Sequence, residues 1–391
     1  MMGEKKKAKL IQFLLFLSVA IISFVAGTRY DSIIATLAPV IGVRSSSERL
    51  DLSSVQKTFQ QLVANYDGQL DHQKLIYGAS RGLTEAAGDP HTAYMDPDEA
   101  EEFNKSLHGN IGGGIGAEIG IRKGKPTIVR PLENSPAKEA GIMAGEVILK
   151  VNDESVIGWD VEKVVSKLRG DIDTSVKLTL LNGDKSHEVS VIRRNIVAPA
   201  VESKIEGEIG ILKVSRFSDD TVIQARQLAT EFKQKGVKKV ILDLRGNPGG
   251  TVNSAQGLLG LWLDKQVVMT ERRGSEVIKE LKSTGHPILT DVKTVVLINE
   301  NSASASEITA GALKEYGKAK LVGQKSYGKG SVQRLVKFSS GAQMKITEAR
   351  WYTPQGKNID KSGIEPDEKV EMTMDDVNNN RDPQLEKAKS L

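Results

Sequence analysis

Residues 240–250 read Val240-Ile241-Leu242-Asp243-Leu244-Arg245-Gly246-Asn247-Pro248-Gly249-Gly250, an apolar run that passes directly into a turn. A short, continuous apolar run of this kind predicts a strand that is buried on both faces of a sheet. An apolar helix is expected at 252–263, immediately after the turn. The Gly249 and Gly250 N–H groups would then lie near a helix N-terminus, where developing negative charge is stabilised.

A second strand and turn of the same kind occur further along the chain. Val295-Val296-Leu297-Ile298-Asn299 predicts another buried strand, and the loop after it carries Ser304 into a helix expected at 306–316. Together with a strand at 209–214 and a helix at 221–235, this pattern predicts an α/β domain. Active sites of open α/β sheets form at the carboxyl ends of the strands, so we expect both turns on one edge.

Ser304 lies in Ser302-Ala303-Ser304-Ala305-Ser306-Glu307, and a glycine-flanked lysine follows in Gly328-Lys329-Gly330. A serine hydroxyl is a poor nucleophile unless a base takes its proton, and a lysine can do so where burial lowers its pKa. On the residues alone, two interpretations stay open: a Ser–Lys pair, or serines that cap a helix beside an ordinary hairpin turn. All five histidines lie outside these motifs: His72, His91, His108, His187 and His286.

The composition limits the class of protein. The 391 residues leave room for two or three domains, and 39% hydrophobic with 27% charged residues are typical of folded domains. The formal net charge is +4, part of it in one N-terminal cluster, so we expect no nucleic-acid partner. Without cysteine there is no disulfide, thiol nucleophile or thiolate metal site. His91 has no second ligand at metal spacing, so no metal and no cofactor are expected.

The N-terminus has the composition of a membrane segment. Lys5, Lys6, Lys7 and Lys9 precede an apolar run at 10–27, which is just long enough to span a bilayer. We expect residues 1–30 to be an uncleaved anchor. A cleaved signal with a weak site at Val25-Ala26-Gly27, which would give a secreted or periplasmic protein, and a buried core helix are the alternatives. The lysines stay in the cytoplasm, which puts the rest of the chain outside it.

Residues 45–108 are expected to be helical after a linker at 45–47. Apolar residues recur at three- and four-residue spacings, as in amphipathic helices. Gly88-Asp89-Pro90-His91-Thr92 predicts a turn, and Asp96-Pro97-Asp98-Glu99 has the pattern of a helix start, with proline first and acidic residues in the first turn.

A further unit begins with the glycine-rich run 110–120, which leads into an alternating strand. Backbone N–H groups in such a run can bind an anion, including a terminal carboxylate, although a flexible hinge at 112–116 is the alternative. A short helix with a glycine stop and then a buried strand at 147–151 follow. A helix at 159–168 and strands at 176–181 and 188–192 complete the unit.

Five motifs occur in the order seen in the C-terminal processing peptidases, also called tail-specific proteases, and the chain resembles this family along nearly its whole length. The motifs are 243–250, 299–308, 326–333, Tyr352-Thr353-Pro354-Gln355-Gly356 and Gly363-Ile364-Glu365-Pro366-Asp367. The resemblance implies an α/β, crotonase/Clp-like protease core at 195–380. An inserted, mostly-β PDZ domain at 109–194, the N-terminal helical region and a C-terminal tail at 381–391 complete the expected fold.

The resemblance also implies roles for residues. Ser304 is expected to be the nucleophile, Lys329 its general base and Gln333 the residue that orients the lysine. The oxyanion hole is expected to consist of N–H groups from Ala305 and from Gly250 or, as second choice, Gly249. The substrate C-terminus is expected to bind the PDZ domain at Gly114, Ile115, Gly116, Ala117 and Arg169. Arg169 alone could equally be an exposed, solvated arginine.

The function that the resemblance implies is a membrane-tethered serine endopeptidase that binds the C-termini of extracytoplasmic proteins and processes them. A homodimer formed by the helical region is also implied. Two alternatives differ in class. A non-catalytic, anchored PDZ scaffold would bind protein tails without turnover, and a cell-wall enzyme would need an additional binding module, of which the sequence after Val370 gives no sign.

Overall fold

The computed structural model describes residues 15–19, 23 and 50–391. The chain divides into two compact units, Met1–Ala79 and Ser80–Leu391. In the first unit, α3 (Ser53–Asn65) is followed by the start of α4 (His72–Glu85), which ends in the second unit. The rings of Phe59 and His72 meet edge to face at 5.3 Å. No residue of α3 is buried: Val55 and Val63 are exposed, and Phe59 and Leu62 are half-buried.

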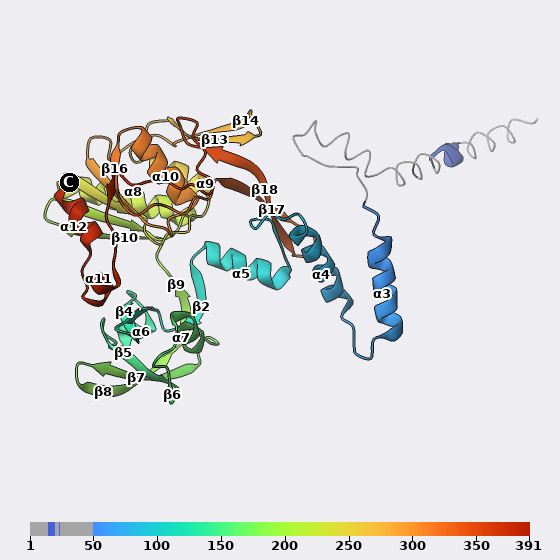
Figure 1. The fold of residues 1–391 in the computed structure, drawn as a ribbon, viewed down its shortest axis with the longest axis horizontal. Helices are drawn as coiled ribbons and strands as arrows, with labels where there is room; N and C mark the ends of the chain where they lie inside the picture. The colour runs from blue at the N-terminus through green and yellow to red at the C-terminus, as the bar shows by residue number, and fades with distance from the viewer. Residues whose placement is uncertain (1–14, 20–22, 24–49) are drawn as a thin grey trace, which may run out of the picture. The chain divides into compact units, whose positions relative to one another are not determined.

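A six-stranded sheet forms the centre of the second unit, in the order β10-β11-β12-β15-β16-β19 (Figure 1). The strands are β10 (Val201–Glu206), β11 (Ile209–Val214), β12 (Lys239–Asp243), β15 (Lys293–Ile298), β16 (Ala319–Gly323) and β19 (Glu368–Lys369). All neighbours from β11 to β19 are parallel, and only β10 is antiparallel. The predicted α/β core and its buried strands are confirmed.

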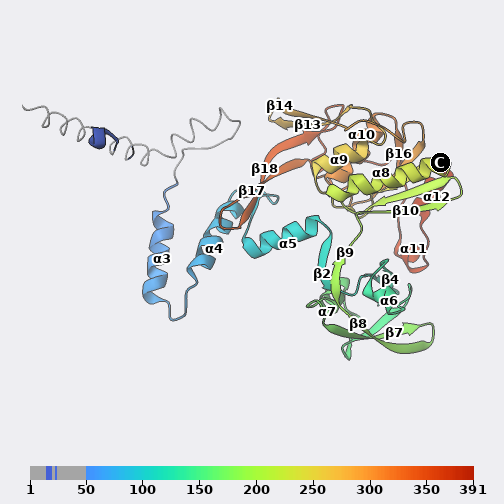
Figure 2. The ribbon, with the colours of Figure 1, turned by 180° about the vertical axis from the view of Figure 1, so that it is seen from behind.

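Helices cover both faces of this sheet. One face packs on α8 (Asp219–Gln234), α9 (Val252–Leu259) and α10 (Ala305–Glu315). Leu242 and Val296 point to that side, and the alternate residues Ile241 and Leu297 point to the other. There the sheet packs on Ala388 and Leu385 of α12 (Pro383–Ser390), which α11 (Met374–Asn378) precedes. Figure 2 shows α8 running along the sheet beside β10.

A second, antiparallel sheet extends from the core. It consists of β1 (Ala93–Met95), β13 (Val267–Arg273), β14 (Glu276–Lys282), β17 (Ser331–Lys337) and β18 (Gln343–Tyr352). The long hairpin β17–β18 pairs along its whole length, and β1 pairs with the first residues of β18. β1 directly follows the turn at 88–92 and precedes α5 (Pro97–Leu107). Because β1 pairs with β18, this turn lies beside a hairpin that is distant in sequence. No local pattern in the sequence predicts this pairing.

The PDZ domain has its own hydrophobic core, which includes Ile128, Ile148 and Leu178. Its strands are β2 (Asn110–Gly114), β3 (Ala117–Arg122), β4 (Lys125–Pro131), β5 (Val147–Val151), β6 (Glu154–Ser155), β7 (Ser175–Asn182), β8 (Lys185–Ile192) and β9 (Arg194–Val197). Its helices are α6 (Pro136–Glu139) and α7 (Val161–Leu168). β3 to β8 form one sheet, and β2 pairs with β9.

Four features differ from the sequence-based expectations. The glycines at 112–114 lie in a strand, β2, because they pair with β9. Helix α9 ends at Leu259 with Gly260 as its C-cap, four residues earlier than expected, and Gly260 lies so close to Thr284 that a Cβ there would be 2.3 Å from its hydroxyl. The expected tail, 381–391, contains α12 and belongs to the core because its apolar face covers the sheet. α11 was not expected.

The expected membrane anchor lies mostly outside the described residues, of which 15–19 and 23 fall within it. Among the residues that are described, no helix has the length and apolar character needed to cross a membrane.

Candidate active site

The two predicted turns meet at the carboxyl edge of the central sheet. β12 and β15 are parallel neighbours, and the ladder continues beyond them because Leu244 N–H donates to the Leu297 carbonyl at 3.0 Å. The turns themselves are cross-linked: Gly246 N–H donates to Asn299 Oδ1 at 2.9 Å, and Ala303 N–H to the Asn247 carbonyl at 3.0 Å. The Pro-Gly-Gly turn is therefore attached to the loop that carries Ser304.

The three serines of this loop have different environments. Ser302 and Ser306 are fully buried, and their hydroxyls donate to the Leu244 and Asn247 carbonyls at 2.8 and 3.0 Å. Both serve to join the two turns. Ser304 is half-buried and begins α10 with φ 55°, a left-handed backbone conformation that is unfavourable for a residue with a side chain. Strain of this kind concentrates at functional sites.

The glycines of the turn lie against Ser304. A Cβ added at Gly249 would be 2.8 Å from Ser304 Cβ and 3.0 Å from Ala305 N, so only glycine fits there. Gly249 N–H is already used, because it donates to Asn247 Oδ1 at 2.8 Å. Within residues 50–391, the N–H groups of Gly250 and Ala305 donate to no protein group.

Glu307, which was not among the residues predicted from the sequence, connects the loop that carries Ser304 to the loop that carries Lys329. Its carboxylate is fully buried and accepts from Ser304 N–H at 2.8 Å on α10. From the lysine loop it accepts the Ser326 hydroxyl at 2.6 Å and the N–H groups of Gly328 and Lys329 at 2.6 and 3.0 Å. The spacing Ser304-x-x-Glu307 is a capping-box pattern that could have indicated it.

The backbone N–H of Lys329 donates to the Glu307 carboxylate, and the Lys329 side chain is half-buried. The flanking glycines permit close packing: a Cβ at Gly328 would be 2.9 Å from Gly363 N, and one at Gly330 would be 2.6 Å from Asp360. Burial lowers the pKa of Lys329 below its usual value, and the charge of Lys345 lowers it further, whereas Glu307 opposes both. This shift favours the neutral amine that a general base requires.

Gln333 lies on β17 and does not hydrogen-bond to Lys329. Its Nε2 donates to Ser331 Oγ at 2.8 Å and to Thr347 Oγ1 at 3.1 Å across the hairpin. Within the described part of the chain, no hydrogen bond joins the Ser304 hydroxyl to the Lys329 amine either. The structure therefore connects the serine and lysine loops through the buried carboxylate of Glu307.

Arg245, directly after β12, supports the same edge of the sheet. Its guanidinium donates two hydrogen bonds to Asp243 and two to Asp382, at 2.7 to 3.0 Å. Asp382 is the N-cap residue of α12. Burial disfavours its charge, but the two carboxylates outweigh this and raise the pKa of Arg245. Arg245 thereby joins the Pro-Gly-Gly turn to the C-terminal helix.

The five residues predicted to bind a substrate tail line one groove of about 160 Å³ on the PDZ domain: Gly114, Ile115, Gly116, Ala117 and Arg169. Ile119 on β3 and Val165 and Leu168 on α7 form its apolar sides. Within residues 50–391, Ile115 N–H and Gly116 N–H donate to no protein group. The C-terminal end of α7 contacts strand β2, since Gly170 N–H donates to the Gly113 carbonyl at 3.2 Å.

Arg193, also absent from the predictions, supports that end of α7. It is buried, and its guanidinium donates to the Leu168 carbonyl at 2.8 Å, the Lys167 carbonyl at 3.4 Å and the Thr174 hydroxyl at 3.0 Å. A cation at a helix C-terminus is favourable, because the last carbonyls carry partial negative charge.

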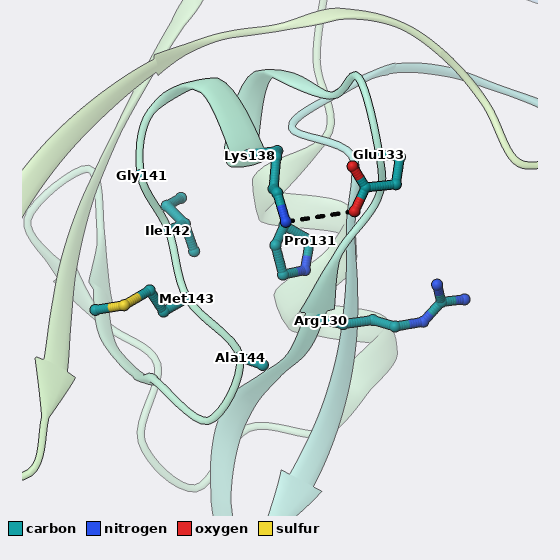
Figure 3. Close-up of a pocket in the computed structure, with 8 residues that line it drawn as sticks. All are labelled: Arg130, Pro131, Glu133, Lys138, Gly141, Ile142, Met143 and Ala144. Carbon is teal, nitrogen blue, oxygen red and sulfur yellow. Dashed lines mark ion pairs between the residues drawn. The ribbon is translucent and has the colours of Figure 1, made fainter. Parts of the chain in front are cut away.

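A second hollow on the PDZ domain, of about 460 Å³, contains none of the predicted residues. It is lined by Arg130, Pro131, Glu133, Lys138 and the segment 141–144 (Figure 3). Lys138 pairs with Glu133 at 3.3 Å across it, and the Arg130 guanidinium points away, toward Glu118 and Glu202. Its charged groups are paired, so the groove between β3 and α7 is the better candidate for a carboxylate.

Comparison with known proteins gives a consistent result. The family model for peptidase family S41 matches residues 208–370, and the PDZ domain model matches 127–182. A probable CtpA-like serine protease of Staphylococcus haemolyticus is 34% identical over 371 residues, which cover 94% of this chain and 74% of the relative. The Staphylococcus aureus protein of the same description is 33% identical over 88% of this chain and 71% of its own.

Solved structures agree with this match. The photosystem II D1 C-terminal processing protease has a TM-score of 0.53 and 25% identity, over 82% of this chain and 87% of its own. A putative S41 protease from Bacteroides fragilis shares the fold, with a TM-score of 0.58 at 16% identity, over 84% of this chain and 91% of its own.

The fold and the matched regions define a serine peptidase that carries a PDZ domain. The chain belongs to peptidase family S41, among the CtpA-like serine proteases, which confirms the resemblance to the C-terminal processing peptidases.

Proposed function

We propose that this peptidase is a membrane-tethered endopeptidase that captures the C-terminus of an extracytoplasmic protein and cleaves it with a Ser304–Lys329 dyad. The observation that carries the dyad is the position of Glu307. One buried carboxylate binds the backbone of Ser304 and of Lys329, so the two loops are held at fixed separation. The buried alternatives, Ser302 and Ser306, have their hydroxyls bound to backbone carbonyls.

The proposed mechanism is acyl transfer in two steps. Neutral Lys329 takes the Ser304 proton as Oγ attacks the scissile carbonyl, and the resulting ammonium protonates the leaving amine. Water, deprotonated by Lys329, then hydrolyses the ester. Gly250 and Ala305 supply the oxyanion hole, because their N–H groups have no protein acceptor, whereas Gly249 N–H is held by Asn247. We expect the Ser304 hydroxyl and the Lys329 amine to hydrogen-bond when substrate binds.

Substrate recognition is assigned to the PDZ groove. An extended tail would add as a strand beside β3, with its carboxylate at the Ile115 and Gly116 N–H groups and its last side chain between Ile119 and Leu168. Arg169 is exposed at the edge of this groove and supplies a positive charge there. Proteins with flexible C-termini are the substrates this arrangement fits.

The proposed membrane tether and the proposed location outside the cytoplasm are based on the sequence. The lysine cluster followed by the apolar run 10–27 supports a single N-terminal anchor with the catalytic part outside the cytoplasm. Fractionation of cells that express the whole chain, with protease added from outside, tests both. Protein that is released by salt alone, or protected from the protease, would contradict this assignment.

Cleavage of a protein with an unstructured C-terminal tail tests the dyad. We expect Ser304→Ala and Lys329→Ala to lose at least about 1,000-fold in kcat/KM, as removal of a nucleophile or its base does. Lys325→Ala, an exposed lysine in the same loop, is the matched control and should cleave normally. Amidation of the substrate's C-terminus should raise KM. Undiminished cleavage by Ser304→Ala would disprove the assignment, and tail binding without turnover by the parent would favour a scaffold.

A further inference from the structure

The segment between β11 and α8, residues 215–218, is paired with the Pro-Gly-Gly turn. Phe217 N–H donates to the Gly249 carbonyl at 2.9 Å, and Thr251 N–H donates to the Phe217 carbonyl at 2.8 Å. These two bonds make Phe217 and Gly250 partners in a parallel bridge. The fit is close, because a Cβ at Gly250 would be 2.0 Å from the Phe217 carbonyl oxygen. The position of the turn therefore depends on the backbone at Phe217.

This pairing also sets the direction of the Gly250 N–H group. In a parallel pairing, the residue between the two bonded groups points its own N–H and carbonyl to the opposite side. Gly250 N–H therefore points away from Phe217, and within residues 50–391 it donates to no protein group. The turn lies against Ser304, since a Cβ at Gly249 would be 2.8 Å from Ser304 Cβ. A movement of Phe217 would reorient a free N–H group beside the proposed nucleophile.

Arg216, the residue before Phe217, connects this segment to the two chain segments that enter and leave the PDZ domain. Its guanidinium donates to the Ala198 carbonyl. It also fills the space above Gly109, which has φ 70° and where a Cβ would be 2.3 Å from the guanidinium carbon. Ala198 N–H donates to the Gly109 carbonyl at 2.9 Å, so the two segments are joined to each other as well.

The same guanidinium is bound on the side of α8. Its Nε donates to Ser218 Oγ and its Nη2 to Asp220 Oδ2, both at 3.1 Å. The Arg216 side chain is only 12% exposed, whereas that of Asp220, the one carboxylate paired with it among the described residues, is 44% exposed. Desolvation of the guanidinium is therefore only partly offset by this ion pair. What the arginine adds over an apolar side chain is a set of directed hydrogen bonds.

We propose that Arg216 is a positioning residue of the peptidase: it fixes the backbone that pairs with Gly250 to Ala198, Ser218 and Asp220, and so holds the Gly250 N–H in the direction that an oxyanion requires. The proposal rests on the proposed function, in which Gly250 N–H is an oxyanion donor. Within the described part of the chain, Arg216 forms no hydrogen bond with Ser304, and it acts through Phe217.

Such a role affects the transition state more than the bound substrate. An oxyanion donor must lie 2.7 to 3.1 Å from the position of the developing charge, and loss of one donor lowers kcat by about 100- to 1,000-fold. A donor that is displaced but still present should lower kcat less, by about tenfold or more. Binding of the uncharged substrate depends little on this N–H group, so KM should change little.

Arg216→Met tests the proposal, because methionine keeps most of the length and the apolar packing and removes the hydrogen bonds. The probe is a peptide boronate with the sequence of the cleaved site: Ser304 Oγ adds to its boron, the proton passes to Lys329, and the tetrahedral adduct carries negative charge. We expect kcat and boronate affinity to fall together, each about tenfold or more. KM and the affinity for an isolated tail peptide should stay close to those of the parent.

Two further variants guard against a general loss of structure. Arg216→Lys keeps the charge and can still donate to the Ala198 carbonyl, so its kcat and boronate affinity should lie between those of the parent and Arg216→Met. Gly109→Ala leaves Arg216 in place but displaces its guanidinium, and should lower kcat and boronate affinity without changing the affinity for the tail peptide.

The matched control is Arg226→Met on α8. The Arg226 guanidinium also donates to a backbone carbonyl, that of His286 at 3.0 Å, and within residues 50–391 it forms no hydrogen bond with the turn. Its loss should leave kcat and boronate affinity unchanged. Lower stability alone would reduce the amount of active enzyme without changing the boronate affinity of the folded fraction, and thermal unfolding of each variant measures it.

The outcomes separate this role from the proposed function. An Arg216→Met enzyme with the parent's kcat and boronate affinity would overturn the proposal. A fall in tail-peptide affinity with unchanged boronate affinity would also overturn it, because Arg216 would then act on the PDZ groove. If Ser304→Ala still forms the boronate adduct and cleaves, the proposed nucleophile is wrong; if Ser304→Ala does neither but Arg216→Met is normal, only the positioning role fails.

Discussion

Individual residues set the chemistry of this site. Ser304 keeps an unfavourable backbone conformation because the turn glycines, the start of α10 and Glu307 all constrain it. Ser304 therefore lacks helical backbone angles. Ser302 and Ser306, on either side of it, are buried and hydrogen-bonded to backbone carbonyls. A run of alternating serines thus contains one half-buried serine, Ser304, between two fully buried serines whose hydroxyls donate to backbone carbonyls.

Cleavage should depend on pH through Lys329. Because the pKa of Lys329 is lowered by burial and by Lys345, the neutral base forms below the usual lysine pKa of about 10.4, and kcat/KM should rise with pH and level off before that value. Lys345→Met removes a like charge, raises the pKa of Lys329 and should move the acid limb to higher pH. Lys337→Met, exposed at the far end of β17, is the control.

The same shift has a consequence for stability. Since the folded-state pKa is below the unfolded one, folding at neutral pH must discharge the amine or bury its charge, and this cost fades as pH rises toward the unfolded value. Lys329→Met should therefore raise the melting temperature at pH 7, with a difference that shrinks toward pH 10. An equal or lower melting temperature at pH 7 would contradict the assigned shift.

Glu307→Gln should uncouple the two loops. An amide cannot accept from four donors at once, and its own NH2 would face N–H groups, so we expect a loss of about 2 to 3 kcal/mol in unfolding free energy and at least about 100-fold in kcat. Chemical denaturation measures the loss in unfolding free energy, and cleavage of a protein with an unstructured C-terminal tail measures the loss in kcat. Glu300→Gln, exposed in the same loop, should change neither. A fully active Glu307→Gln enzyme would show that the loops are held by other contacts.

Among the elements, α7 depends on a residue outside it. Arg193 replaces the missing hydrogen-bond partners of its last carbonyls and is buried without a carboxylate. We expect Arg193→Met to destabilise the PDZ domain by about 2 kcal/mol or more and to weaken tail binding, because the groove loses its fixed α7 edge. Arg194→Met, exposed on β9, is the control.

Calorimetry of the Arg193→Met protein should show a shift confined to one transition, because the PDZ domain and the protease core have separate hydrophobic cores. A single transition that moves as a whole would mean that the two domains unfold together. Peptide binding, measured by fluorescence anisotropy, reports the groove independently.

The strands and helices of the core differ in how well the sequence predicts them. β12, β15, α8 and α10 follow from local signals: apolar runs, a turn and a helix start. The pairing of β1 with β18 does not, because the two strands lie far apart in the chain. For the same reason Thr92 and Thr347 carry no sequence signal that links them to Gln333.

For the whole molecule, the first unit supports the expected homodimer. Val55, Val63 and Ile76 are 49%, 54% and 56% exposed, on two helices with helical spacing, and isolated monomers rarely leave such faces open. We expect sedimentation to give a dimer of the 50–391 protein. Val63→Glu with Ile76→Glu should convert it to a monomer, whereas Ile223→Glu, exposed on α8, should not. A monomeric parent at micromolar concentration would exclude this interface.

The sequence by itself determined the class of protein and the motifs of the proposed site. Ser304, Lys329 and the Pro-Gly-Gly turn are recognisable because strands, turns and helix starts are set by neighbouring residues, and a serine peptidase with a PDZ domain followed from them. The tertiary structure decided which serines are bonded to backbone carbonyls, how Glu307 couples the two loops, and how Thr347 and Thr92 connect Gln333 to the turn at 88–92. These contacts join residues far apart in the chain, and only the packed sheets bring their hydrogen-bonding groups within range.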